Sequence, residues 1–300
     1  MLSLLAHLTA ALALFAPQSQ PAQRFTSRSD LVVLPVAVVD RKSGFVTGLP
    51  REAFTVYDNG KPQTISFFEN AARPVTVGLL IDSSISMLPR RDAVIAAGLT
   101  FAGTCRADDE VFTINFNERV WPGLPDGVNF TSDAEQIREA LQRAGARGKT
   151  ALFDALAAGL KHLTLGRHQQ KALIVVSDGG DNASRSTAAG VLDAAMRMDT
   201  VIYTLSIQDE NPGEANPDLL RKLTASTGGQ SFFVRKTSQV APTLERILRD
   251  IRNAYVIGYA PSDPPRAGEL HSIRVDVKPP DGRKLQVRSR SGYVTSGGGQ

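Results

Sequence analysis

Two acids and two hydroxyl groups stand at positions where buried strands are expected to end. Asp82, Ser84 and Ser86 follow the apolar stretch 75–81 and are spaced two residues apart. Asp178 follows another apolar run of strand length. Open sheets of parallel strands bind ligands at the carboxyl ends of their strands. Hydroxyl and carboxylate oxygens at that edge suit Mg²⁺, Mn²⁺ or Ca²⁺ rather than zinc or copper.

A third hydroxyl group belongs with this set. Thr150 lies at or near the amino end of a helix predicted to begin within residues 148–156. We expect Ser84 and Ser86 to bind the ion directly, with Asp82 orienting them through water or hydrogen bonds. Thr150 adds a hydroxyl ligand, and Asp178 holds the ion through water. Few carboxylates then touch the ion, so its charge attracts an anionic oxygen from a partner's Asp or Glu. Hydroxyl-rich ligation favours Mg²⁺ or Mn²⁺ over Ca²⁺, because Mg²⁺ retains exchangeable waters.

Alternating strands and helices must position these residues. The predicted strands are near-continuous apolar runs, which is typical of strands covered on both faces: residues 75–81, 110–116, 172–177, 201–207 and 231–234. Helix ends are marked by a capping box at 132–135, by Asn216-Pro217 and by Gly228-Gly229. Repeated strand–helix units predict an α/β fold, a mostly parallel sheet with helices on both faces.

The flanking segments are predicted to be β structure. Asn59-Gly60 lies between the strand-like runs 54–57 and 64–67, and Asp281-Gly282 lies between 271–278 and 284–290, so each signals a tight hairpin. Neither flank is long enough to form a core alone. We therefore expect the flanks to pair as one β-sandwich-like module, with the α/β domain inserted between them. The predicted segments are 1–23, a signal peptide; 24–73, β; 74–253, α/β; 254–296, β; and 297–300, a flexible tail.

Composition and the amino terminus bear on location. The 300 residues carry a formal charge of +4, with 21% charged and 42% hydrophobic residues, as in an ordinary globular chain, and basic runs interleaved with aromatics are lacking. Nucleic acid is therefore not an expected partner.

Residues 1–15 form an apolar segment too short to span a bilayer, followed by a polar stretch, which favours export to a secreted or periplasmic location. A short core helix is the alternative, because no Lys or Arg precedes the segment. No later stretch is expected to span a membrane.

Enzymatic chemistry finds little support in the sequence. A phosphotransferase of the haloacid dehalogenase type needs a second acid two residues after its first, where this chain has Ser84. The histidines His162 and His168 are six residues apart and read as surface residues, and no histidine accompanies a serine-hydrolase motif. Gly148-Lys149-Thr150 lacks the upstream glycine of a nucleotide-binding loop. Cys105 is expected to be a small buried hydrophobic residue.

Taken together, the three loops resemble the metal-ion-dependent adhesion site (MIDAS) of von Willebrand factor A domains. The matching positions are Asp82, Ser84, Ser86, Thr150 and Asp178-Gly179, in the family's order, within residues 74–253. The flanks are similar to those of exported bacterial proteins of the von Willebrand factor A-related type described from acidobacteria. The resemblance implies a Rossmann-like sheet with a short antiparallel edge strand near 120–124. It also implies a binding protein rather than an enzyme.

Two functions remain open from the sequence. One is an exported adhesion module whose ion captures a partner's carboxylate. The other is an accessory subunit that recruits or regulates an enzyme or chaperone complex. A domain that keeps the fold without needing the ion is a third possibility for the site itself.

Overall fold

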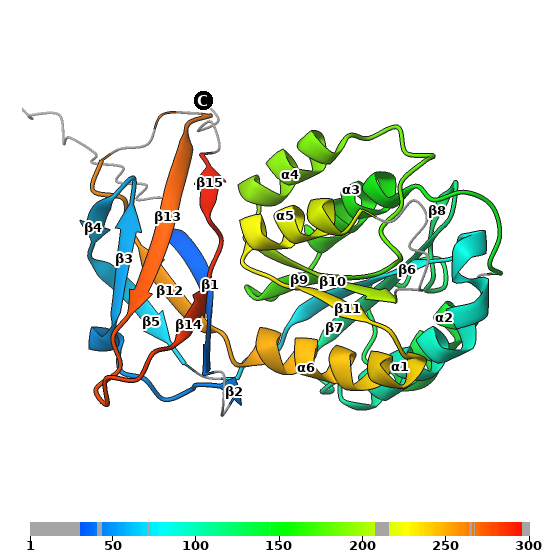
Figure 1. The fold of residues 1–300 in the computed structure, drawn as a ribbon, viewed down its shortest axis with the longest axis horizontal. Coiled ribbons are helices and arrows are strands. Elements are labelled where there is room, and N and C mark those ends of the chain that lie inside the picture. The colour runs from blue at the N-terminus through cyan, green and yellow to red at the C-terminus, as the bar shows by residue number, and fades with distance from the viewer. Residues whose placement is uncertain are drawn as a thin grey trace, which may run out of the picture.

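A six-stranded sheet forms the centre of the α/β part of the protein (Figure 1). The computed structural model describes residues 31–40, 44–70, 72–143, 145–207, 216–263, 266 and 268–295, so the predicted signal peptide and tail lie outside the described residues. The strand order is β11-β10-β9-β6-β7-β8. The strands are β6 (Thr76–Asp82), β7 (Glu110–Phe116), β8 (Val120–Pro122), β9 (Lys171–Val176), β10 (Thr200–Ile207) and β11 (Ser231–Val234).

Strand direction follows the sequence-based expectation. The pairs from β11 to β7 are all parallel, and β8 runs antiparallel to β7 at the edge. The five predicted strands are confirmed to within one residue at each end. The predicted antiparallel edge strand near 120–124 is β8. The strands β6, β7 and β10 are buried along their whole length because helices cover both faces of the sheet.

Within the described residues, six α-helices form two layers on this sheet (Figure 1). One layer holds α1 (Arg91–Gly103), α2 (Ala134–Gln142) and α6 (Val240–Arg252); the other holds α3 (Leu152–Leu163), α4 (Ala188–Arg197) and α5 (Pro217–Thr227). Two apolar clusters fill the spaces between sheet and helices. Short 3-10 helices occupy Ile85–Arg90, Arg51–Ala53 and Thr237–Gln239. The α/β fold class predicted from the sequence is confirmed.

Helix caps explain where two of these helices begin. Asn216 caps α5 by accepting a hydrogen bond from the Leu219 amide at 3.1 Å, and Gly228 ends it at φ 84°, both as predicted. The expected capping box at 132–135 is displaced by one residue. Asp133, not Ser132, is the N-cap of α2 and accepts from the Glu135 amide at 2.8 Å. Ser132 and Asp133 can both cap a helix, so the geometry of the preceding loop decides which of them becomes the N-cap.

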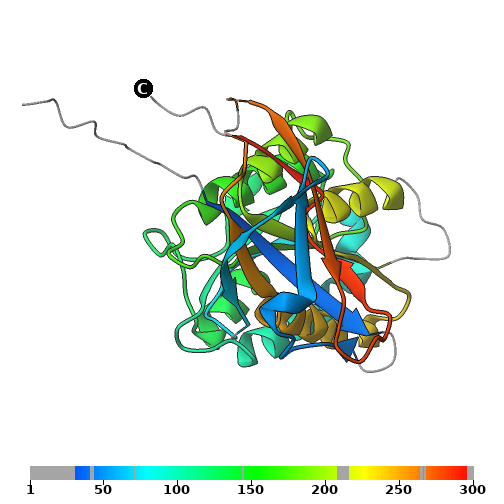
Figure 2. The ribbon, with the colours of Figure 1, turned by 90° about the vertical axis from the view of Figure 1, so that its left-hand side faces the viewer.

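Strands from both flanks share two further sheets beside the α/β part (Figures 1 and 2). One sheet has the order β14-β1-β12-β5, with β2 on β1, and the other has the order β15-β13-β3-β4. The amino-terminal strands are β1 (Val32–Asp40), β2 (Gly44–Phe45), β3 (Phe54–Asp58), β4 (Lys61–Gln63) and β5 (Ile65–Glu69). The carboxyl-terminal strands are β12 (Tyr255–Tyr259), β13 (Leu270–Val277), β14 (Gln286–Arg288) and β15 (Gly292–Val294). One apolar cluster draws side chains from both flanks. This arrangement is the predicted β-sandwich-like module.

Both predicted hairpins need correction in this module. Asn59-Gly60 does make a tight turn, but β3 pairs with β4, and the run at 64–67 belongs to β5, which pairs with β12 in the other sheet. The turn at Asp281-Gly282 joins β13 to β14, yet β14 pairs with β1 rather than with β13. In each case the chain crosses between sheets after the turn. The turn residues specify a local reversal, whereas the burial of alternating side chains decides which strand becomes the neighbour.

Truncation at Asn253 should unfold the amino-terminal strands as well. Such a chain lacks β12, which lies between β1 and β5, and β13, which pairs with β3. Without these partners, β5 loses its ladder hydrogen bonds, β1 and β3 keep only their short pairings with β2 and β4, and all three lose most of their shared core. Hydrogen exchange followed by mass spectrometry should show the region 32–69 exchanging at the rate of unprotected amides. Unchanged protection there would rule out a module that depends on both flanks.

Candidate metal centre

Asp82 ends β6 and is the most buried acid of the predicted site. Its side chain is held on both oxygens: Oδ1 accepts from the Ser84 amide at 2.8 Å, and Oδ2 accepts from the Ser177 hydroxyl at 2.6 Å. Ile81 lies opposite Val176 in the parallel pairing of β6 with β9, so the two strands deliver Asp82 and Ser177 to the same edge. The Asp82 carboxylate therefore has a fixed orientation.

Burial sets the charge state of Asp82. The pKa of its carboxyl is raised from 3.8 to about 6, chiefly because the group is removed from water and to a smaller degree because Asp178 is negatively charged. Hydrogen bonds from Ser177 and Ser84 act in the opposite direction because they stabilise the carboxylate. The contribution of Asp178 means that the two acids are close enough to interact. A cation at this edge would relieve both the burial penalty and the repulsion.

The two serine hydroxyls have the separation that adjacent metal ligands require. Ser84 Oγ and Ser86 Oγ are 3.0 Å apart. Neighbouring oxygens of an octahedral Mg²⁺ centre, each about 2.1 Å from the ion, are also separated by about 3.0 Å. Ser84 is buried whereas Ser86 is exposed, so the pair faces outward from the sheet edge. The donor set therefore fits a small hard cation.

A second loop brings Thr150 to the same edge. The Arg147 amide donates to the Ser83 carbonyl at 2.9 Å, and the Ile85 amide donates to the Gly148 carbonyl at 3.2 Å. These two bonds join the loop before α3 to the loop after β6. Thr150 is buried two residues before α3 begins, in agreement with the predicted position near the amino end of that helix.

Gly148 is required by the path of this loop. Its φ is +74°, and a Cβ atom at this position would overlap the Glu118 carboxylate at 1.6 Å. The same carboxylate accepts from the Lys149 amide at 3.1 Å. Only glycine combines this backbone conformation with the close approach of Glu118. The glycine thereby lets the loop reach the serines.

The third loop carries Asp178 and follows β9. Asp178 is partly buried, and its Oδ1 accepts from the Gly180 amide at 3.3 Å. Asn182 lies further along the loop. Its side-chain Oδ1 accepts from the Thr150 backbone amide at 2.9 Å, and its backbone amide donates to the Thr150 carbonyl at 3.0 Å. The third loop is thus joined to the second. Hydrogen bonds connect all three predicted loops at the carboxyl edge of the sheet, whereas ligation of a metal by them stays a prediction.

Three residues that support the site were missed by the sequence reasoning. Ser177 orients Asp82, and Asn182 fixes Thr150. Asp154, on α3, accepts from the Arg185 amide at 3.0 Å and the Ser186 amide at 2.8 Å, which holds the third loop against α3. The available signal was position: Ser177 immediately precedes Asp178, at the end of a strand next to that of Asp82.

Other reactive side chains lie away from this edge. His162 and His168 are partly buried rather than fully exposed; their Nε2 atoms contact the carbonyls of Asn129 and Asp108, each at 2.8 Å. Cys105 comes just after α1 and packs against an apolar cluster, and burial raises the pKa of its thiol to about 12. An unreactive packing role for Cys105, as predicted, is consistent with that environment.

The described part of the chain holds neither a cluster of conventional metal ligands nor a helix that could span a membrane. Within those residues, no group of three or more His, Cys, Asp or Glu side chains is placed to hold a metal ion. A site built chiefly from serine and threonine hydroxyls would not be of that kind. Across the same residues, every helix is too short or too polar to cross a membrane.

Comparison with known proteins defines the class of this fold and site. Residues 77–180 match the profile of the von Willebrand factor type A domain. This chain therefore carries a von Willebrand factor A domain, a class of domain that generally mediates interactions, and the matched segment contains all five predicted site residues.

Individual relatives are distant. A curated protein described as uncharacterized, from Synechocystis, is 23% identical over 184 residues, which are 60% of this chain and 42% of the relative; the match thus spans well under half of that protein's length. A von Willebrand factor type A structure from Catenulispora acidiphila has a TM-score of 0.53 at 16% identity, covering 83% of this chain and 75% of that one. Proximal thread matrix protein 1 from the mussel byssus, in a structure with a zinc-occupied MIDAS motif, has a TM-score of 0.51 at 14% identity, covering 65% and 49%. At these identities the structural likeness establishes the fold.

Proposed function

We propose that this protein is an exported, metal-dependent adhesion module that captures a carboxylate of a partner protein. Asp82, Ser84, Ser86, Thr150 and Asp178 would hold the ion, with Mg²⁺ or Mn²⁺ favoured over Ca²⁺. The proposal rests mainly on the 3.0 Å separation of the two serine hydroxyls beside a buried carboxylate that Ser177 holds in place. The ion, when bound, supplies an electrophilic centre that accepts a carboxylate oxygen in exchange for water.

The chain's own residues define how a partner would approach. Ser84 and Thr150 are buried and Ser86 is exposed, which leaves the outer side of the ion open. Ile85 and Leu88, on the 3-10 helix that follows Ser84, are 58% and 53% exposed. Large apolar side chains in water next to a polar site favour a protein surface as the occupant. We therefore expect the partner to present an acidic residue beside apolar ones.

Replacing both serines should remove the metal. The Ser84→Ala/Ser86→Ala variant loses two hydroxyl ligands and leaves the Asp82 carboxylate in place. We expect the Mg²⁺ affinity, measured by isothermal titration calorimetry, to fall at least about 100-fold, since even a supporting residue of a metal site contributes about 10- to 100-fold. Capture of partners from an extracytoplasmic extract should be lost to the same extent as when a chelator is added to the natural protein.

A matched control replaces two serines at the other end of the sheet. Ser132 donates to the Ala107 carbonyl and Ser226 to the Lys222 carbonyl, both remote from the metal-site loops. The Ser132→Ala/Ser226→Ala variant should bind Mg²⁺ and partners normally. Intact Mg²⁺ affinity in the Ser84/Ser86 variant would refute the assignment of the site. Identification of the captured protein distinguishes an adhesion ligand from an enzyme or chaperone complex, which the accessory-subunit alternative predicts.

A further inference from the structure

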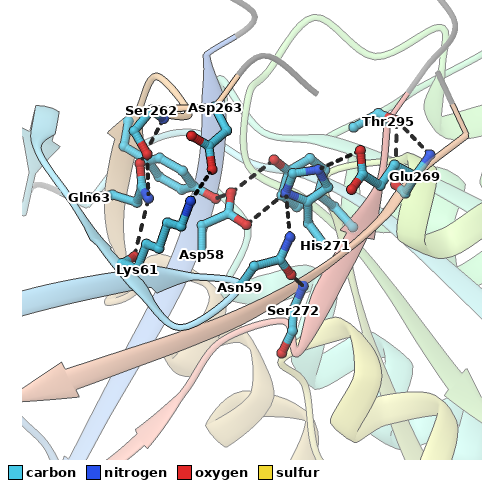
Figure 3. A network of polar contacts seen from close by, with 12 residues as sticks. Asp58, Asn59, Lys61, Gln63, Ser262, Asp263, Glu269, His271, Ser272 and Thr295 are labelled. Atoms are coloured by element: carbon cyan, nitrogen blue, oxygen red, sulfur yellow. Dashed lines mark hydrogen bonds and ion pairs between the residues drawn. The ribbon is translucent and has the colours of Figure 1, made fainter. Parts of the chain in front are cut away.

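The β module contains a polar cavity far in sequence from the metal-site loops. Its volume is about 520 Å³, and the turn after β3, the segment after β12 and the start of β13 contribute to its walls (Figure 3). The described lining residues include three acids, Asp58, Asp263 and Glu269. They also include Arg266 and His271. Even with the Lys61 ammonium paired to Asp263, three carboxylates face the two positive charges of Lys61 and Arg266, and this excess favours a cationic occupant.

Asp58 is a buried acceptor for three side chains at the base of this cavity. Its Oδ2 accepts from the hydroxyls of Tyr259 at 2.8 Å and Tyr293 at 3.1 Å, and its Oδ1 lies 2.7 Å from Nδ1 of His271 (Figure 3). A carboxylate can only accept, so Nδ1 carries the ring proton. With the proton on Nδ1, the neutral form of the ring presents the lone pair of Nε2 on its other side. The ring is also stacked on Tyr293, with centroids 4.8 Å apart, which fixes its orientation.

The acceptor on the other side of His271 is unused. His271 is 5% exposed, and its Nε2 has no hydrogen-bond partner within the described part of the chain. Glu269 Oε2 faces Nε2 at 3.9 Å, which exceeds the length of a hydrogen bond (Figure 3). A donor nitrogen placed about 2.9 Å from each of these two atoms would bridge the gap. Glu269 is 45% exposed, so its side chain has room to move and admit such a group.

An ion pair within the chain shows that a primary ammonium group fits at the rim of the cavity. Lys61, at the start of β4, places its ammonium 2.6 Å from Oδ2 of Asp263, a lining residue of the cavity (Figure 3). A primary ammonium therefore already lies on one acid at the rim. Deeper in the cavity, Nε2 of His271 has no donor within the described part of the chain. Glu269 Oε2 accepts from the Arg266 amide at 3.2 Å, and a carboxylate oxygen can accept a second hydrogen bond.

We propose that this cavity binds a primary ammonium group, carried by a small organic amine or by a lysine side chain of a peptide. The ammonium donates to Nε2 of His271 and to the Glu269 carboxylate. Asp58 acts as a positioning residue, since it fixes the tautomer of His271 without reaching the ligand. The site is independent of the metal centre and of the function proposed for it.

Calorimetric titration of the full chain at about pH 8, where histidine is ordinarily neutral, tests this proposal. The probes are 1,5-diaminopentane, Nα-acetyl-lysine amide and the neutral 1,5-pentanediol. The two amines should bind, and the diol should not. Glu269→Gln should weaken amine binding at least about tenfold, because a charge-assisted hydrogen bond becomes a neutral one. The control Glu52→Gln, at an exposed acid of the same module, should leave binding unchanged.

A spectroscopic measurement on the natural chain avoids reliance on variants. Bound amine should shift the ¹⁵N resonance of His271 Nε2 and leave its tautomer unchanged. Binding by both amines, or by one of them, supports the proposal and identifies the source of the ammonium. Equal binding of the diol, an unmoved His271 resonance, or undiminished binding by Glu269→Gln would overturn it. The Ser84→Ala/Ser86→Ala variant should bind the amines normally, so failure of the metal site and failure of this site are distinguishable.

Discussion

Asp82→Asn is expected to stabilise the metal-free protein at neutral pH and to abolish its stabilisation by Mg²⁺. The Asp82 side chain is 3% exposed, and its pKa of about 6 lies above the ordinary 3.8. Ionisation therefore opposes folding: the favourable contribution is complete below about pH 4 and is lost as the pH rises through about 6. The difference between 3.8 and about 6 corresponds to about 3 kcal/mol at pH 7 as an upper figure. Asparagine stays neutral: its Oδ1 can accept from the Ser84 amide, and its Nδ2 can donate to the Ser177 hydroxyl oxygen.

Chemical denaturation of metal-free protein at several pH values measures this effect. The gain in unfolding free energy of the variant should be largest above pH 6 and should vanish near pH 3.5. With Mg²⁺ added, the natural protein should gain stability by mass action, whereas Asp82→Asn should gain little. Asp92→Asn, at an exposed acid in the first turn of α1, serves as the control and should change stability by about 0.5 kcal/mol or less. If Asp82→Asn is less stable than the natural chain at pH 7, ionisation of the buried Asp82 does not oppose folding.

Arg288→Ala is expected to destabilise the protein by about 3 to 5 kcal/mol at neutral pH. Arg288 lies on β14, and its guanidinium bonds to Asp250 on α6, which ties the β module to the α/β domain. The Asp250 side chain is 1% exposed, and burial raises its pKa while Arg288 lowers it. Removal of the arginine leaves a buried carboxylate without its main counter-charge, and the Gln230 amide also loses a donor at 2.8 Å.

The pH dependence separates this charge effect from a simple loss of packing. Without Arg288, the pKa of Asp250 should rise further, so the deficit should shrink as the pH falls and the carboxyl takes up a proton. Asp250→Asn in the Arg288→Ala background should restore part of the lost stability. Arg197→Ala breaks an exposed ion pair with Asp193, 2.9 Å long, and should cost no more than about 1 kcal/mol. Equal losses for Arg288→Ala and Arg197→Ala in urea denaturation would contradict the buried-pair interpretation.

The metal-site loops were predictable because their geometry follows from strand direction. Asp82 and Asp178 each follow an apolar run, and parallel strands end at the same edge, so their proximity required no knowledge of side-chain packing. Thr150 could be placed because it lies at the amino end of a predicted helix, and the family resemblance then joined its loop to the other two. The supporting contacts of Ser177 and Asn182 were not predictable, since a serine or asparagine next to a motif is as compatible with a solvated turn as with a buried hydrogen bond.

The antiparallel edge at β8 was implied by the family resemblance, whereas the sequence by itself determined the α/β fold, its strand boundaries and the set of oxygen-bearing residues at one edge of the sheet. These follow from local signals, namely apolar run length, caps and turn residues. Only the tertiary structure decided that β5 and β14 leave their expected hairpins for the other sheet, and that Asp58, Glu269 and His271 meet at one cavity. Those contacts join residues about 200 positions apart, and packing of the two flanks, which no local pattern encodes, selects them.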